Sequence, residues 1–212
     1  MTALYYTPNS PYARKVRILL AEKGLEFKPE LLPVAPSGSG RFFPASYEAM
    51  NPNKRIPLLV DGPRRLWESG LIQDYLFAAY PHSAEGNSPP LAPSLTRPGR
   101  HWEDLMILNT IDTMLDSGVN LFQFIRGGMQ PGAVPYLRRE MDRTQSELDW
   151  LEQEIGPEGF WPGAFCAMDI NLICALGWLE LRKPVPWRRP KLEAFMQRHA
   201  SRPSVKESHP PG

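Results

Sequence analysis

Short apolar runs and amphipathic segments alternate along the first 80 residues. Helices are predicted where apolar residues recur at helical spacing, over Pro11–Gly24, in a turn near Ala45–Met50, and from Ser69 onward. Strands are predicted where apolar runs end at turn signals, over Leu4–Tyr6, Phe27–Val34, Ile56–Val60 and Arg65–Trp67. The predicted order is therefore β-α-β-α-β-β-α.

The pattern changes after residue 80. Residues 81–91 are rich in Pro, Ser and Gly, as linkers between domains are. Only helical spacing follows, at about Ala92–Arg126, Val134–Ile155, Met168–Arg182 and Pro190–His199. The third of these helices is apolar on nearly every side, which is typical of the centre of a bundle. The sequence thus predicts an α+β domain over residues 1–80, a linker over 81–91 and an all-helical domain over 92–212.

Composition narrows the possible functions. The net charge of +1 argues against a broad nucleic-acid or lipid-binding face, and no apolar run reaches the length of a membrane span. Cys166 and Cys174 would lie about 12 Å apart on one helix, too far for a disulfide, which favours a reduced, cytoplasmic protein. The four histidines lack metal-ligand spacing. We expect no metal, no nucleic acid and no membrane partner.

The first chemical signal is Ser10-Pro11-Tyr12-Ala13, at the turn between the first strand and the first helix. It has the shape of the thiol-redox sequence Cys-Pro-Tyr-Cys but holds no cysteine, which excludes dithiol exchange by the protein's own thiols. A hydroxyl at a helix N-terminus favours an anion and can donate a hydrogen bond to a ligand's thiolate. The alternative is that Ser10 is only a helix cap.

Two further signals lie near the ends of predicted strands. If the Ile56–Pro57 bond is cis, the backbone of Ile56 is free to pair with an extended peptide; the alternative is a trans proline at a strand start. Glu68 and Ser69 precede an amphipathic helix, where Ser69 and the helix N-terminus suit a carboxylate and Glu68 suits an ammonium group. Taken alone, such a dipeptide is usually just a helix cap.

Together these motifs resemble the glutathione transferase family, in particular its Ser-type bacterial, theta- and zeta-like branches. The resemblance continues to Asp169-Ile170 and Arg202-Pro203-Ser204 and covers essentially the whole chain. It implies a thioredoxin-like N-terminal domain followed by a helical one, in agreement with the predicted element order.

The resemblance also implies roles for the matching residues. Ser10 falls where a hydroxyl activates the glutathione thiol, with strand residues Tyr5 and Tyr6 as alternatives. The glutathione-binding residues it implies are Arg55 near the glycyl end, Ile56 and the cis proline Pro57 at the cysteinyl part, and Glu68 and Ser69 at the γ-glutamyl head.

As function, the resemblance implies attack of bound glutathione, the co-substrate, on an electrophilic and mostly apolar small molecule, in a homodimeric cytoplasmic enzyme. We expect the second-substrate pocket between the domains, lined by Pro11, Tyr12, Trp102, Met106 and Asn109. The alternatives are a glutathione-dependent isomerase or dehalogenase on the same scaffold, or a non-catalytic glutathione-binding regulator.

Two positions depart from the family pattern. Cys166 stands where the family usually has Ser or Thr, three residues before Asp169, in the capping box of its central C-terminal helix. Because a thiol is a weak acceptor, we expect this cap to be weaker by up to about 1 kcal/mol. In the loop over residues 38–43, no basic residue aligns clearly with the one that contacts the glycyl carboxylate in many members of the family, and Arg41 is only a candidate for it.

Overall fold

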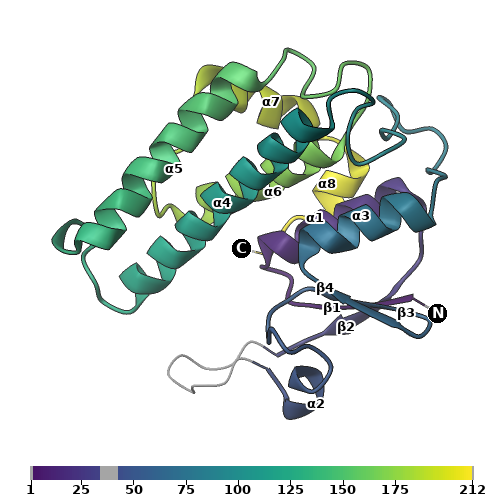
Figure 1. Ribbon diagram of the computed structural model, residues 1–212, viewed down its shortest axis with the longest axis horizontal. Coiled ribbons are helices and arrows are strands. Elements are labelled where there is room, and N and C mark those ends of the chain that lie inside the picture. The colour runs from purple at the N-terminus through teal and green to yellow at the C-terminus, as the bar shows by residue number, and fades with distance from the viewer. Residues whose placement is uncertain (1, 34–42, 212) are drawn as a thin grey trace. The chain divides into compact units, whose positions relative to one another are not determined.

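The computed structural model describes residues 2–33 and 43–211. The chain divides into two compact units, one formed by Met1–Leu95 with Pro203–Gly212 and the other by Thr96–Arg202 (Figure 1). This division differs from the predicted one in that residues 203–212 group with the N-terminal unit. Within the described ranges, no helix is both long enough and apolar enough to cross a membrane.

The first unit is built on a four-stranded mixed sheet in the order β2-β1-β3-β4. β1 (Thr2–Tyr6) runs parallel to β2 (Lys28–Leu31) and antiparallel to β3 (Leu58–Asp61), which pairs with β4 (Arg64–Trp67). Tyr5 lies opposite Leu58, and Leu58 lies opposite Trp67. The end of β1, the start of β3 and the end of β4 therefore meet at one edge of the sheet.

Helices α1 (Pro11–Glu22) and α3 (Ser69–Ala79) pack together on one face of this sheet, and the short α2 (Ala45–Glu48) follows β2 (Figure 1). Val16, Leu19 and Leu20 of α1 are fully buried, as their spacing predicts. The predicted β-α-β-α-β-β-α order is confirmed.

Asp61 ties the far end of α3 to the sheet. It accepts hydrogen bonds from the hydroxyls of Tyr75 at 2.6 Å, Tyr80 at 2.5 Å and Thr2 at 3.0 Å. Partial burial acts to raise the pKa of Asp61, but these three donors outweigh it and hold that pKa below its usual value. The same bond to Asp61 raises the pKa of Tyr75 to about 12.

The C-terminal segment completes the first unit through α8 (Pro203–Glu207), which packs on α1. The buried guanidinium of Arg14 donates to the Val205 carbonyl at 3.0 Å and to the Ser208 hydroxyl at 3.3 Å. The Ser204 hydroxyl donates to the buried Glu22 carboxylate. These contacts join positions more than 180 residues apart and explain why the segment groups with the sheet.

The second unit is helical, as predicted. It contains α4 (His101–Arg126), the 3-10 turn η1 (Pro131–Ala133), α5 (Pro135–Glu154), α6 (Ala167–Arg182) and α7 (Pro190–His199). Every residue from Ala167 to Leu176 is buried, which confirms α6 as the central helix. The prediction that the first helix starts near Ala92 is wrong. Pro98 disfavours helical backbone in the residue before it, Gly99 is left-handed at φ +76, and α4 starts at His101.

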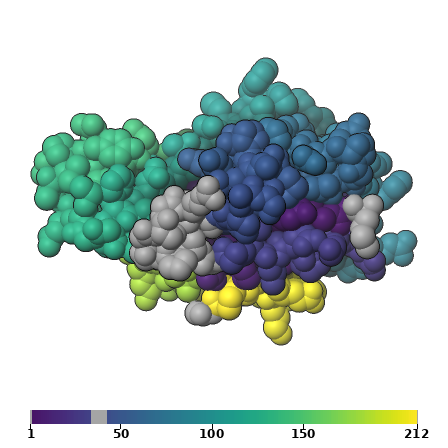
Figure 2. Space-filling view, turned by 90° about the horizontal axis from the view of Figure 1, so that it is seen from below, coloured from purple at the N-terminus to yellow at the C-terminus, as the bar shows by residue number. Residues whose placement is uncertain are grey.

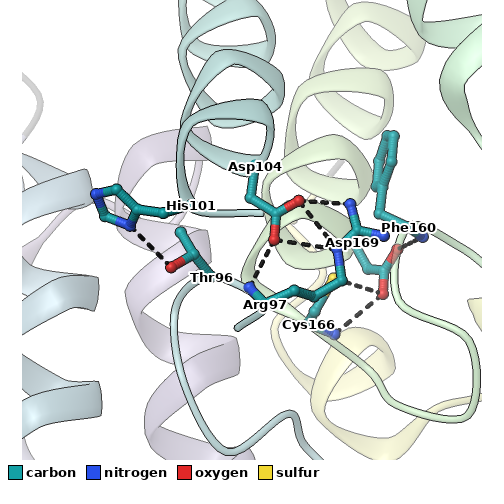
Figure 3. A network of polar contacts seen from close by, with 7 residues as sticks. All are labelled: Thr96, Arg97, His101, Asp104, Phe160, Cys166 and Asp169. Atoms are coloured by element: carbon teal, nitrogen blue, oxygen red, sulfur yellow. Dashed lines mark hydrogen bonds and ion pairs between the residues drawn. The ribbon is translucent and has the colours of Figure 1, made fainter. Parts of the chain in front are cut away.

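Two carboxylates organise the start of α4 and of α6 (Figure 3). Asp104 is fully buried and accepts from the Arg97 backbone amide at 2.6 Å and from its guanidinium at 2.5 to 3.1 Å. Asp169, also fully buried, accepts from the backbone amides of Phe160 and Cys166 and from the Cys166 thiol at 3.1 Å. Cys166 and Asp169 thus form the predicted capping box, with a thiol in the place of a hydroxyl.

Candidate functional site

Ser10 caps α1 at the edge of the sheet where β1 ends. Its backbone is extended, at φ −77 and ψ 120, and its hydroxyl oxygen accepts from the Ala13 amide at 3.2 Å. Its own amide donates to the Thr7 carbonyl at 3.1 Å, which closes the turn. Pro11 follows at the first helical position, where its missing N–H costs nothing.

The cap leaves the Ser10 hydroxyl able to donate. A serine hydroxyl has one proton and two acceptor lone pairs, and the bond from Ala13 uses a lone pair. Among the residues that the structure describes, no acceptor lies within hydrogen-bond distance of this proton. The position therefore combines the positive end of a helix dipole with an uncommitted donor, which is an arrangement that stabilises an anion.

The entry to β3 lies at the same edge. The Ile56–Pro57 bond is cis, which confirms the prediction for this pair. Ile56 precedes β3, and within the described chain its N–H and C=O take part in no hydrogen bond. Continuing the antiparallel register from Tyr5 and Leu58 brings Ile56 opposite Thr7, at the start of the Ser10 turn.

The loop before Ile56 is held by Asn51, which is fully buried. The Asn51 amide donates to the Arg55 carbonyl at 2.6 Å, and the Tyr47 hydroxyl donates to the same oxygen at 2.5 Å. The Asn51 side-chain oxygen accepts from the Asn53 amide at 3.0 Å. Sequence reasoning interpreted Asn51-Pro52 only as a turn and missed this support; the tendency of Asn to bond the backbone two residues on was the available signal.

Glu68 and Ser69 complete the edge, directly after β4. Glu68 has a left-handed backbone, at φ 69 and ψ 116, a conformation that costs a non-glycine residue about 1 kcal/mol or more. Its carboxylate accepts from the Asn53 side-chain amide at 2.7 Å. Ser69 was predicted as the helix cap but is the first residue of α3, with Glu68 at the cap position; its side chain is buried. The first backbone amides of α3, which have no hydrogen-bond acceptor within the helix, therefore lie at Ser69 and the residues directly after it.

The remaining candidates occupy varied positions. The Arg55 side chain is exposed, and Arg41 lies outside the described residues. Tyr5 and Tyr6 lie in β1, where the Tyr5 ring is 5.9 Å from Tyr47 and the Tyr6 ring is 6.5 Å from Phe27. Neither tyrosine is at the start of a helix.

The predicted pocket residues come from both units. In the first unit, Pro11 is buried and Tyr12 is half-buried, with the Lys15 ammonium 5.4 Å from the Tyr12 ring centre. In the second unit, α4 carries three exposed residues at helical spacing, namely Trp102, Met106 and Asn109. Their joint role in a pocket stays a prediction. Over the described ranges, no group of three or more His, Cys, Asp or Glu residues is arranged to hold a metal ion.

Comparison with known proteins gives consistent matches. Residues 4–89 match the family model described as glutathione S-transferase, N-terminal domain. Glutathione S-transferase 3 of Zea mays is 28% identical over 213 residues, covering 97% of this chain and 91% of the relative.

Solved structures match along the whole chain. A glutathione transferase family member from Pseudomonas fluorescens with bound glutathione is 26% identical, with a TM-score of 0.80 and full coverage of both chains. A glutathione S-transferase from Methylobacillus flagellatus with bound glutathione is 25% identical, with a TM-score of 0.78 and full coverage of both chains. The N-terminal family model, the relative and the solved structures all make this chain similar to glutathione S-transferases.

Proposed function

We propose that this protein is a glutathione transferase that uses Ser10 to activate the thiol of bound glutathione for attack on an electrophilic, mostly apolar second substrate. The observation that carries the proposal is the meeting of three features at one edge of the sheet. They are the uncommitted Ser10 hydroxyl, the unpaired backbone of Ile56 and the Glu68–Ser69 start of α3.

Each feature suits one part of the tripeptide. The Ile56 N–H and C=O would pair with the cysteinyl backbone beside Pro57, as an added strand does. The Ser69 hydroxyl and the first amides of α3 would hold the γ-glutamyl carboxylate, and the Glu68 carboxylate would hold its ammonium group. The exposed Arg55 guanidinium would face the glycyl carboxylate. With this head-to-tail placement the cysteinyl sulfur comes to Ser10.

The chemical task of Ser10 is to shift the thiol equilibrium. A thiol with a pKa of about 8.5 is roughly 3% ionised at pH 7, and lowering that pKa to about 6.5 makes it roughly three quarters ionised. This shift corresponds to about 2.7 kcal/mol, within the range of a hydrogen bond to a charged group plus a helix dipole. The thiol proton leaves to solvent. The thiolate electron pair then forms a sulfur–carbon bond, and the leaving group departs with the pair of the broken bond.

Ser10→Ala tests this role. We expect conjugation of a chlorodinitroarene to fall at least tenfold, and the pKa of enzyme-bound glutathione, followed by thiolate absorbance, to rise toward its free value. Affinity for glutathione should change little. Because alanine also removes a helix cap that stabilises by about 1 kcal/mol, Ser10→Gly is the matched variant: it lacks the hydroxyl but costs only a few tenths of a kcal/mol at a cap. Ser10→Thr should restore activity.

The contrary outcomes are distinct. Full activity of Ser10→Ala would shift the role to Tyr5 or Tyr6. Retention of the wild-type chain on immobilised glutathione without any conjugation would favour a non-catalytic glutathione-binding regulator. No uptake of glutathione at millimolar concentration in calorimetry would refute the proposal itself.

The second substrate and the assembly state belong to the same proposal. The proposed contacts to the second substrate remain Pro11, Tyr12, Trp102, Met106 and Asn109. Their chemistry would decide between conjugation and an isomerase or dehalogenase activity. The family resemblance implies a homodimer in the cytoplasm. Sedimentation equilibrium of the full chain checks the dimer.

A further inference from the structure

The segment from the end of α4 to the start of α5, residues 117–139, differs in charge from the rest of the chain. We call it the α4–α5 tip. It contains three exposed arginines and no Asp or Glu, in a chain whose 24 basic residues are balanced overall by 23 acidic ones. The nearest carboxylate that follows, Glu140, is buried and pairs with Arg143 at 2.9 Å. The arginines of the tip are Arg126, Arg138 and Arg139.

The same tip carries much of the exposed apolar surface. Phe124 and Ile125 are each 40% exposed, Met129 is 45% exposed and Tyr136 is 46% exposed. They make up half of the large hydrophobic side chains that are exposed over the described ranges. Figure 2 shows this part of the chain, teal to green, on the surface at the left of the view. An exposed apolar group of this kind, with charges of one sign in the same segment, is typical of an interaction site.

The backbone of the tip is closed by regular hydrogen bonds. The Met129 amide donates to the Phe124 carbonyl and the Gly128 amide donates to the Ile125 carbonyl, both at 3.0 Å, with Gly128 left-handed at φ +86. This is the Schellman arrangement, which brings the side chains of Phe124 and Met129 to the same side of the helix end. The apolar side chains are therefore presented by a defined turn that needs no ordering on binding.

We propose that the α4–α5 tip docks on the surface of an anionic phospholipid bilayer. The side chains that would enter the head-group region are Phe124, Ile125, Met129 and Tyr136. Aromatic and apolar side chains are commonly found there, at the interface between membrane and water. The three arginines would lie at the lipid phosphates, and charge complementarity selects an anionic surface. This proposal departs from the expectation of no membrane partner, which rested on the net charge of the whole chain and not on this local group of arginines. The inference is independent of glutathione binding, because none of these residues belongs to the sheet edge described above.

Vesicle co-sedimentation of the full chain tests the proposal. The probes are vesicles of phosphatidylcholine alone and vesicles in which about a third of the lipid is phosphatidylglycerol. We expect the wild-type protein to pellet with the anionic vesicles only and to be released by high salt. Phe124→Ser with Met129→Ser should weaken binding about tenfold or more. Arg138→Gln with Arg139→Gln should weaken it about 25-fold, since each arginine near an anionic surface contributes about fivefold.

Matched controls separate the tip from general surface effects. Trp102→Ser with Met106→Ser removes apolar side chains that are even more exposed from the other end of α4. Arg100→Gln with Arg198→Gln removes the same charge elsewhere. Both pairs should bind vesicles as the wild type does.

Three results would overturn the proposal. The first is a wild-type chain that stays in the supernatant with both vesicle types. The second is equal binding by the tip variants and the controls. The third is a wild-type oligomer that ignores vesicles but falls to a monomer with Phe124→Ser and Met129→Ser, which would assign the tip to a contact between copies.

Discussion

Replacing Cys166 by serine changes one atom in the capping box of α6. The Cys166 thiol lies 3.1 Å from Asp169 Oδ2, and both residues are fully buried, so water does not compete for this contact. A thiol is a weak donor and a weak acceptor, whereas a serine hydroxyl is strong as both. Serine would therefore strengthen its bond to the carboxylate and its acceptance of the Asp169 backbone amide, without moving the backbone.

The size of the effect follows from these two bonds. A good N-cap stabilises a protein by about 0.5–2 kcal/mol, and the existing thiol already supplies part of this. Burial of a hydroxyl costs free energy only where it lacks partners, and here it has two. We expect a net gain of about 1 kcal/mol in the free energy of unfolding, or about 2–4 °C in Tm for a chain of this size.

The gain should depend on pH with a definite sign. Burial raises the pKa of Asp169 to about 6 in the folded protein, against an ordinary value of 3.8. Asp169 thus contributes most stability below pH 3.8 and loses it as pH rises through about 6. A stronger donor at residue 166 favours the ionised carboxylate and lowers this pKa toward the unfolded value. The gain in the free energy of unfolding from serine should therefore be small below pH 3.8 and reach its full size above about pH 6.

Denaturant unfolding of both proteins at about pH 5 and about pH 8 measures the difference. Cys174→Ser is the control, because Cys174 is a buried thiol inside the same helix rather than at its cap; serine there should be neutral or destabilising. An unchanged or lower Tm for Cys166→Ser at neutral pH, or a gain larger at the lower pH, would refute the reasoning.

Three further predictions concern the N-terminal unit. Glu68→Gly should raise Tm by relieving the left-handed backbone and yet weaken glutathione binding in calorimetry; unchanged affinity would contradict the proposed role of this carboxylate. Arg14→Met should lower the free energy of urea unfolding by about 2–4 kcal/mol because it deletes buried bonds to the C-terminal segment, and a loss below about 1 kcal/mol would argue against that attachment. Tyr75→Phe should destabilise by about 1 kcal/mol and raise the pKa of Asp61, measurable by NMR titration; an unmoved pKa would contradict the assigned hydrogen bond.

The sequence predicted the element order well because local signals there agree with the tertiary structure. Ser10 followed by Pro11 is both a good cap and a good helix start, and the structure uses it as such. Gly99 shows the opposite case. Helical spacing alone extended α4 back toward Ala92, although Pro98 and Gly99 oppose a helix at that point.

The sequence predicted which residues form the candidate site, but it predicted less well the contacts that hold these residues in place. Ser10, Ile56 and Glu68 come together because strand register brings their turns to one edge, and register follows from the order of strands. Two features of the site arise from contacts between loops. They are the left-handed backbone of Glu68 and the hydrogen bond from the Asn51 side chain to the Arg55 carbonyl. No periodicity in the sequence encodes such contacts.

The attachment of residues 203–208 to α1 has a consequence for synthesis of the chain. Arg14 and Glu22 are buried in the finished fold. Arg14 donates a hydrogen bond to Ser208 and Glu22 accepts one from Ser204, and both partners are translated more than 180 positions later. A ribosome therefore releases the sheet and its helices well before these bonds can form. Helix α1, which Ser10 caps, therefore lacks its packing contact with α8 until the helical unit has been synthesised.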